Sequence, residues 1–365
     1  MTGGSFVTAV LWGSALLDAA ALLALVSRRH VPAAVAVAGA VVVKLFVVGG
    51  IGAASFGLLH VIYLGLVVTL PVVGLGLLVM RRGRRRVRTV LLSLALLVPA
   101  PFGVYASFVE PARLRVERTT VPVAQERAGD RDLRVAVLAD IQTNDVGDYE
   151  WRAIERTNRL RPHVVLVPGD LFQMSTARRR RELPELRALV RELRAPGGVF
   201  VVEGDSDDPH ELRAALRGSG ARLLVNDVVT TRVAGRELTI GGIELGWRTP
   251  GASRVYRELE ARPGRGDFRI LLAHRPDAVY PLPEEPRTDL VVAGHTHGGQ
   301  VAIPGYGPPL TLTAVPREVG AGGLHTMDGG RRIYVSRGVG HEHGGHAPRL
   351  RLFCPPEISL LTLRG

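Results

Sequence analysis

Cysteine and lysine are almost missing from this chain of 365 residues. Cys354 is its only cysteine, which excludes a disulfide framework and a zinc site built from several thiolates. Of the 46 basic residues all but Lys44 are arginines, a bias that indicates genomic base composition rather than selection for a ligand. An apolar content of 46% and a mean hydropathy of +0.17 exclude a disordered chain. The sequence therefore indicates a globular protein of about two or three domains, part of which could lie in a membrane.

Acidic residues are scarce in residues 1–110. This region has nine basic side chains against only Asp18 and Glu110, whereas the other 255 residues carry 37 basic and 32 acidic groups. A nucleic-acid-binding domain concentrates positive charge on one surface, so the near balance of the second region argues against that class. We expect no nucleic acid among the partners.

Residues 1–110 contain four apolar stretches of about 19 to 25 residues, the length of helix that crosses a ~30 Å hydrocarbon layer. We predict a four-helix transmembrane region with spans at about 6–26, 32–50, 56–80 and 89–108. Asp18 and Lys44 should face the interior of the bundle, where they form a buried pair or line an ion or substrate path. Membrane lipid is then a partner of the chain.

The loops between these spans differ in charge. Residues 27–30 and 81–88 are rich in arginine, whereas residues 49–55 are uncharged. Because positive loops stay in the cytoplasm, the pattern predicts a multi-pass protein of the cell membrane whose large domain lies on the extracytoplasmic side. A cleaved signal peptide fits poorly, because no basic segment precedes Phe6.

Residues 111–133 read as a linker, and residues 134–365 as one soluble domain. Short runs rich in Val and Leu predict strands at 133–139, 163–167, 199–202, 237–243, 268–272, 289–293, 332–335 and 357–363. Helical patterns lie between several of them, at 148–160, 176–194, 209–217 and 253–261. Alternating strands and helices favour an α/β domain with at least partly parallel pairing.

Polar side chains follow these strands at their carboxyl ends, where ligands bind in open α/β sheets. Each residue alone could be a helix cap or a buried core histidine, but six together predict one crevice that binds metal. Mixed Asp and His ligands suit a pair of divalent cations such as Mn²⁺, Fe²⁺ or Zn²⁺, which would clamp a reacting phosphate. The six residues are Asp140, Asp170, Asp205, His274, His295 and His297.

These residues lie in segments that resemble the calcineurin-like metallophosphoesterase superfamily, and specifically its membrane-anchored bacterial branch. The most specific segment is Gly294-His295-Thr296-His297-Gly298-Gly299-Gln300, and Pro168-Gly169-Asp170-Leu171 and Leu272-Ala273-His274-Arg275-Pro276-Asp277 support it. The resemblance covers roughly 134–363 and does not include the predicted spans. It implies an α/β/β/α sandwich and a di-metal hydrolase of phosphate esters.

The resemblance also implies roles for the ligands. Asp140 and His297 would hold the first metal, His274 and His295 the second, and Asp170 would bridge them. Asp205 occupies the place of the family's Asn ligand to the second metal and adds one negative charge.

Two other positions depart from the family pattern. Gln142 replaces the histidine of the first Asp-x-His motif, although its carbonyl oxygen can still bind a hard cation. Ser206 replaces a histidine to which the family assigns stabilisation of charge on the phosphate or protonation of the leaving oxygen, and a serine is a poor acid near neutral pH. Leaving groups that need no proton, such as the phosphate side of a pyrophosphate, are therefore favoured. Arg275 is expected to contact the substrate phosphate.

We interpret the chain as a membrane-bound di-metal phosphoesterase that hydrolyses phosphodiester or pyrophosphate bonds through a metal-bound hydroxide. Its substrate would be an envelope molecule, such as a lipid-linked phosphate. The alternative is a catalytically degenerate metal- or ligand-binding membrane protein, a sensor or scaffold, which Gln142 and Ser206 would favour. A transporter with an accessory domain is weaker, because four spans show no repeat. The His-rich segment 341–346 is either an extra metal or phosphate contact or a surface loop.

Overall fold

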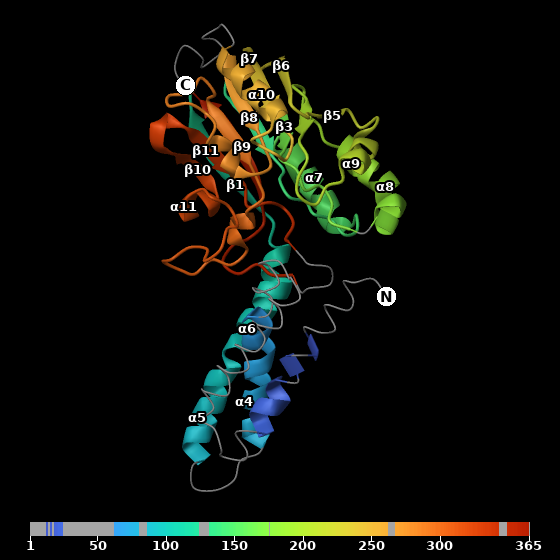
Figure 1. Ribbon diagram of the computed structural model, residues 1–365. Coiled ribbons are helices and arrows are strands. Elements are labelled where there is room, and N and C mark those ends of the chain that lie inside the picture. Colours follow the sequence, from blue (N-terminus) through green and yellow to red (C-terminus); the bar gives the residue numbers. More distant parts are fainter. Residues whose placement is uncertain are drawn as a thin grey trace. The chain divides into compact units, whose positions relative to one another are not determined.

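The computed structural model describes residues 12–24 without 14 and 17, and residues 62–79, 86–123, 131–174, 176–261, 267–342 and 349–364. The chain divides into two compact units (Figure 1). One comprises Met1–Val109 with Glu342–Leu350, and the other comprises Glu110–His341 with Arg351–Gly365. Each unit is described separately.

The first unit is helical in its described part. Its elements are the π-helical turns η1 (Gly65–Thr69) and η2 (Tyr105–Val109) and the helices α4 (Leu70–Val79), α5 (Arg86–Leu97) and α6 (Pro99–Val104). Helical residues between 12 and 24 pack against α4 through Ala19, Leu22, Val73 and Leu77.

Two helical stretches of this region, Ile62–Val79 and Val87–Ala112, are long and apolar enough to cross a membrane. They coincide with the spans predicted at 56–80 and 89–108. The described part of the chain thus contains two candidate spans, and a four-helix transmembrane region is not confirmed. The predicted span 32–50 and Lys44 lie outside the described residues, as do residues 6–11, 14, 17, 25 and 26 of the span 6–26.

The second unit contains two six-stranded sheets. The first sheet has the order β1-β12-β2-β3-β4-β5, with β2 to β5 mutually parallel and β12 antiparallel to β2. Its strands are β1 (Arg115–Pro122), β2 (Leu133–Val137), β3 (Val164–Val167), β4 (Val199–Val201), β5 (Ala221–Leu223) and β12 (Glu357–Arg364).

The second sheet has the order β10-β11-β9-β8-β7-β6, in which β7, β8, β9 and β11 are parallel. Its strands are β6 (Asp227–Val233), β7 (Arg236–Gly242), β8 (Asp267–Leu272), β9 (Leu290–Ala293), β10 (Gly323–Thr326) and β11 (Arg332–Val335). Four central strands therefore end at the same edge, as they do in the first sheet.

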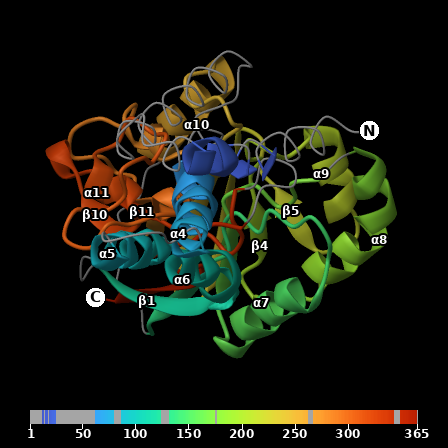
Figure 2. The same ribbon diagram turned by 90° about the horizontal axis from the view of Figure 1, so that it is seen from below.

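The two sheets pack face to face through a shared core. Val135 and Leu166 of the first sheet belong to the same buried cluster as Ile270 and Val292 of the second. Helices α7 (Asp148–Arg159), α8 (Thr176–Arg191) and α9 (Pro209–Leu216) cover the outer face of the first sheet, and α10 (Pro250–Ala261) covers that of the second. Figure 2 shows α7, α8 and α9 grouped away from α10 and α11 (Arg317–Gly320). The unit is thus an α/β/β/α sandwich.

The eight predicted strands and four predicted helices of this unit are confirmed to within a few residues. The segment expected as a linker, residues 111–133, differs from the prediction because it contains β1, which pairs with β12 in parallel. Its alternation of exposed and half-buried positions includes the charged Arg115, Glu117 and Arg118, so its sequence resembles a polar connector. The pairing depends on a strand some 240 residues away (Arg115 with Glu357), which no local pattern reveals.

Candidate metal centre

The three predicted acidic ligands lie at the carboxyl ends of neighbouring strands of the first sheet. Asp140 follows β2, Asp170 follows β3 and Asp205 follows β4. Asp140 (φ 49°) and Asp170 (φ 53°) adopt the left-handed backbone region, which costs about 1–3 kcal/mol per residue and is found mainly at functional sites. A Cβ atom at Gly204 would collide with the Asp170 carboxylate, so the turn before Asp205 requires glycine there.

The three histidines follow strands of the second sheet. His274 comes after β8, while His295 (φ 72°) and His297 (φ 49°) come after β9. His274 and His297 are almost fully buried. Nδ1 of His274 lies 2.7 Å from the carbonyl oxygen of Pro168, on the first sheet's side of the site. If this atom donates to that carbonyl, Nε2 is left as the ring's free lone pair.

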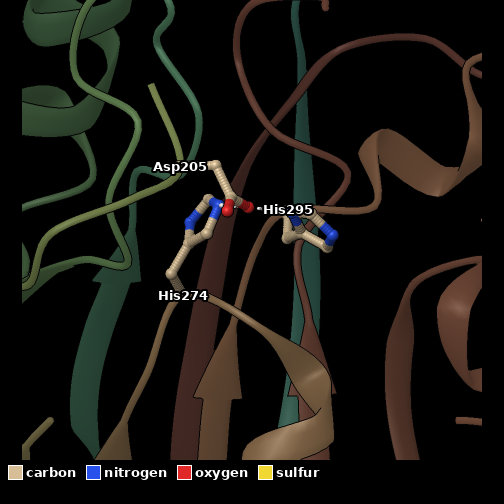
Figure 3. A group of neighbouring side chains, drawn as sticks. All are labelled: Asp205, His274 and His295. Atoms are coloured by element: carbon tan, nitrogen blue, oxygen red, sulfur yellow. Dashed lines mark ion pairs between the residues drawn. The ribbon is translucent and has the colours of Figure 1, made fainter. Parts of the chain in front are cut away.

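Acids and imidazoles meet where the edges of the two sheets adjoin. Figure 3 shows His274 and His295 on either side of the Asp205 carboxylate. Oδ2 of Asp205 lies 3.1 Å from His274 Nε2 and 2.8 Å from His295 Nδ1. His274 Nε2 is also 3.6 Å from Oδ2 of Asp170. The backbone N–H of His295 donates to the Asp140 carboxylate at 3.0 Å, so the two halves of the site also support each other.

The ligand atoms form two groups of the size that holds a cation. Asp205, His274 and His295 make one group, and Asp140, Asp170 and His274 make the other, with the ligand atoms of each within 4.8 Å of one another. His274 belongs to both. Five of the six predicted ligands thus lie in groups that could hold a metal ion.

The buried acids and histidines of the centre shift one another's pKa values. Burial, and then the neighbouring Asp170 charge, raises the pKa of Asp140 to about 8. Burial alone would lower the pKa of His274, but Asp170, Asp205 and Asp140 outweigh it and raise that pKa to about 10. Burial would likewise raise the pKa of Asp205, yet hydrogen bonds from His274, His295 and Arg275 hold it well below its usual range. A divalent cation at this position would offset the same carboxylate charges.

His297 is placed differently from the other predicted ligands. Its Nε2 is buried without a hydrogen-bond partner, and its Nδ1 lies 3.2 Å from the guanidinium of Arg351. Burial, and then the Arg351 charge, lowers the pKa of His297 well below its usual value, so the ring is neutral. Because a guanidinium only donates, Nδ1 accepts here and the proton sits on Nε2. His297 as a metal ligand therefore stays a prediction from the resemblance.

The remaining predicted residues also lie at the centre. Gln142 (φ 42°) donates from Nε2 to Oδ2 of Asp170 at 2.9 Å, so it braces a ligand through its amide nitrogen. Ser206 donates its backbone N–H to Oδ1 of Asp170 at 2.8 Å, and its hydroxyl donates to the Phe172 carbonyl at 2.9 Å. The single hydroxyl proton of Ser206 is therefore used within the loop. Arg275 pairs with Asp205 through Nε, at 3.2 Å, and through a terminal nitrogen.

Two residues that hold the ligand loops in place were not predicted from the sequence. Asp207 accepts hydrogen bonds from the backbone N–H groups of Gly204 and Leu171, both at 3.0 Å, and so ties the loops of Asp205 and Asp170 together. Burial, and then the Asp170 charge, raises its pKa to about 7. Arg351, fully buried, donates to the carbonyls of His297 and Arg337 at 3.0 and 2.8 Å. The Asp-Ser-Asp run pointed to Asp207, whereas nothing in the local sequence distinguishes Arg351 from the other arginines.

Residues 343–346 of the His-rich segment lie outside the described residues. Arg337, another arginine near this segment, forms an ion pair with the buried Glu357 at 3.1 Å.

The donor set fits divalent cations. Carboxylates and imidazoles together suit Mn²⁺, Fe²⁺ or Zn²⁺. The buried Nε2 atom of His274 lies 3.1 Å from the Asp205 carboxylate and 3.6 Å from that of Asp170, and Nδ1 of the same ring lies 4.0 Å from that of Asp140. A cation beside Nε2 would satisfy this nitrogen and offset the charge of Asp140, Asp170 and Asp205 at once.

Comparison with known proteins agrees with this geometry. A family model described as calcineurin-like phosphoesterase matches residues 133–299. "Phosphodiesterase YaeI" of Escherichia coli (strain K12) is 30% identical over 280 residues, which are 72% of this chain and 92% of that protein. "Uncharacterized metallophosphoesterase YkuE" of Bacillus subtilis (strain 168) is 26% identical over 269 residues, which are 72% of this chain and 89% of that protein.

The sandwich and the metal centre therefore define a metallophosphoesterase. The chain belongs to the calcineurin-like phosphoesterase family.

Proposed function

We propose that this protein is a membrane-bound phosphodiesterase or pyrophosphohydrolase that works with two divalent cations. The observation that carries the proposal is the meeting of Asp205 with His274 and His295, beside Asp140 and Asp170. Family membership supports a phosphoesterase activity, and one relative is named a phosphodiesterase. The ions would be Mn²⁺, Fe²⁺ or Zn²⁺.

In this proposal one ion is held by Asp205, His274 and His295, and the other by Asp140 and Asp170. Divalent cations supply Lewis-acid charge, which activates water and neutralises the reacting phosphate. Arg275 exchanges its contact with Asp205 for the phosphate oxygens, which a guanidinium binds bidentately. Gln142 and the N–H of Ser206 hold Asp170 in place.

The hydrogen bond of the Ser206 hydroxyl limits which leaving groups the enzyme can release. Its proton is donated to the Phe172 carbonyl, so it does not reach a departing oxygen in this geometry. We infer a preference for leaving groups that need no proton, such as a phosphate released from a pyrophosphate or a phenolate of low pKa. His297 is neutral and carries its proton on Nε2 when Arg351 donates to Nδ1, so it offers a buried hydrogen-bond donor but no acid that would protonate a leaving oxygen.

The membrane part of the proposal has separate support. Ile62–Val79 and Val87–Ala112 are apolar enough to span a bilayer. The arginine-rich segment 81–88 between them would lie in the cytoplasm by the positive-inside rule, which leaves the catalytic domain outside. A substrate of the cell envelope, for example a lipid-linked phosphate, follows from that location.

Hydrolysis by the Asp170→Asn variant tests the function. The full chain in detergent, assayed with bis(4-nitrophenyl) phosphate and Mn²⁺, should turn over the ester and lose activity with EDTA. Even residues behind a ligand change metal affinity or activity by about 10- to 100-fold, so the variant should lose at least about 100-fold. Asp227→Asn, an exposed substitution on β6, is the matched control.

Bound Mn²⁺ without turnover in the wild-type chain would instead favour the sensor or scaffold. Equal rates for wild type and Asp170→Asn would overturn the assignment of the centre.

A further inference from the structure

Exposed apolar side chains of the second unit gather at one place. Among its described residues four large apolar side chains are exposed, namely Tyr280 (38%), Ile303 (48%), Tyr306 (54%) and Phe353 (48%). We call these four residues the apolar lip. Exposed apolar side chains that cluster on a folded domain often mark a binding site.

The four residues are tied to one segment of chain, residues 300–317. Ile303 and Tyr306 share a turn in which the Tyr306 N–H donates to the Ile303 carbonyl at 2.9 Å. Phe353 follows Leu352, whose carbonyl accepts from the N–H of Ala302 at 2.9 Å. The Tyr280 hydroxyl donates to the Ala314 carbonyl at 2.9 Å. Residues distant in sequence thus converge on the same surface loop.

The same segment forms one wall of a groove of about 720 Å³. Residues 309–315 line it together with Trp247, Arg275, Asp277 and Arg317. Arg317 lies 3.9 Å from the ring centroid of Tyr306, which connects the groove to the lip.

At its other side the groove adjoins the metal centre. Arg275 lines the groove and pairs with Asp205, and His295 Nε2 lies 3.3 Å from the carbonyl oxygen of Leu312. The groove therefore lies between the segment that carries the lip and the site of the proposed reaction.

The charge pattern defines what fits this surface. Residues 298–316 contain no charged side chain, in a chain with 22% charged residues. Arg275 and Arg317 are the cationic groups of the groove, and Asp277 is its acidic group. The Asp277 carboxylate is buried and accepts hydrogen bonds from the Thr313 hydroxyl at 2.7 Å and the Ala314 N–H at 2.8 Å, so it faces the loop rather than a ligand. An uncharged, partly aromatic lip beside two guanidinium groups suits an amphipathic anion, with its phosphate near the arginines and its hydrocarbon along the lip.

We propose that the apolar lip and the groove bind a phosphoester lipid at a membrane surface, with the lipid tail against Ile303, Tyr306 and Phe353. This rests on the proposed function and names its substrate class. Tyrosine at the boundary between water and hydrocarbon is typical of membrane-contacting surfaces. The two apolar helices of the same chain favour a lipid over a soluble protein as the occupant.

A pair of esters with the same leaving group tests the proposal. Hexadecyl 4-nitrophenyl phosphate and methyl 4-nitrophenyl phosphate differ only in the alkyl chain and are assayed with the full chain in mixed micelles of phosphatidylcholine and dodecyl maltoside. The measured quantity is the ratio of their kcat/KM values. Ile303→Asp and Phe353→Asp should each lower this ratio at least about tenfold, because burial of only two or three methylenes changes an affinity by that much. Phe353 has φ 54°, a conformation that Asp tolerates, so that variant should fold.

Ala261→Asp places the same charge on an exposed position of α10 and should leave both kcat/KM values unchanged. Equal losses on both esters in the lip variants, or an unchanged ratio, would overturn the proposal. If the wild-type chain hydrolyses neither ester, it is the proposed function that fails.

A measurement that does not depend on catalysis then tests whether the apolar lip contacts lipid. Ile303→Trp in nanodiscs of brominated phosphatidylcholine should show fluorescence quenching beyond that of the wild type, whereas Ala261→Trp should not. Absence of added quenching in Ile303→Trp would contradict lipid contact.

Discussion

The two sheets contribute different chemistry to the centre. The first sheet supplies only carboxylates, Asp140, Asp170 and Asp205, and the second supplies only imidazoles, His274, His295 and His297. Both sets follow parallel strands at their carboxyl ends, so the same backbone arrangement presents acids on one side and bases on the other.

The two sets are also held in place by different partners. The acids accept from backbone N–H groups, as Asp170 does from Ser206 and Asp140 from His295. The imidazoles instead contact backbone carbonyl oxygens. His274 Nδ1 lies near that of Pro168, and His295 Nε2 lies near that of Leu312. Two of these four contacts cross from one sheet's loops to the other's. The centre therefore exists only when the sheets are packed together, because neither side holds its own ligands completely.

Of the variants that test this comparison, Arg351→Met should have the largest effect, a loss of stability. It removes the guanidinium that contacts His297 on the side of the second sheet. The fully buried guanidinium serves His297 and several carbonyls, and each buried polar group left unsatisfied costs about 1–3 kcal/mol. We expect a loss of at least about 3 kcal/mol of unfolding free energy, measured by denaturation of the full chain in detergent.

The matched control for that variant is Arg331→Met. Arg331 also donates to backbone carbonyls, of Leu282 and Asp328, but it is only half-buried, so water can reach these carbonyls when the guanidinium is removed. Similar losses in both variants would show that Arg351 has no special part in holding the imidazole side.

Asp205→Asn tests the contact between the two sheets' ligands, because Asp205 of the first sheet contacts His274 and His295 of the second. Hydrogen bonds from His274, His295 and Arg275 overcome its burial and keep its pKa well below the usual range, so it is charged at every working pH. The amide restores the family's residue and keeps the shape while removing one charge. Mn²⁺ affinity measured by calorimetry should fall about tenfold, which equals about 1.4 kcal/mol.

Asp208→Asn is the control for the charge change. Asp208 caps α9 by accepting from the N–H groups of His210 and Glu211, and Asn caps a helix equally well. Unchanged affinity in Asp205→Asn would mean that this carboxylate does not contact the ion.

Ser206→Ala should have the smallest effect. The change removes the hydroxyl bond to the Phe172 carbonyl, worth about 1 kcal/mol of stability. Cleavage of a pyrophosphate bond should change little, since the hydroxyl already donates within the loop. Ser219→Ala, which removes a similar bond to the Leu216 carbonyl outside the centre, is the control. A rate loss near 100-fold specific to Ser206→Ala would instead assign a chemical role to this hydroxyl.

Much of the fold was predictable because its strands are continuous apolar runs that end in polar residues. Asp140 and His295 could be recognised as site residues from that pattern alone. The edge strand β1 and the supporting Arg351 could not, because each acquires its role from a partner distant in the chain, β12 for the strand and His297 for the arginine.

The sequence by itself determined which residue types stand at the strand ends, since hydrophobic runs and the turns that interrupt them are local properties. The tertiary structure decided which atoms face one another. Only packing of the two sheets brings the Asp205 carboxylate between His274 and His295, directs the Ser206 hydroxyl to a carbonyl and places the apolar lip beside the arginines of the groove. Contacts of this kind depend on long-range pairing, which a local pattern of residues does not encode.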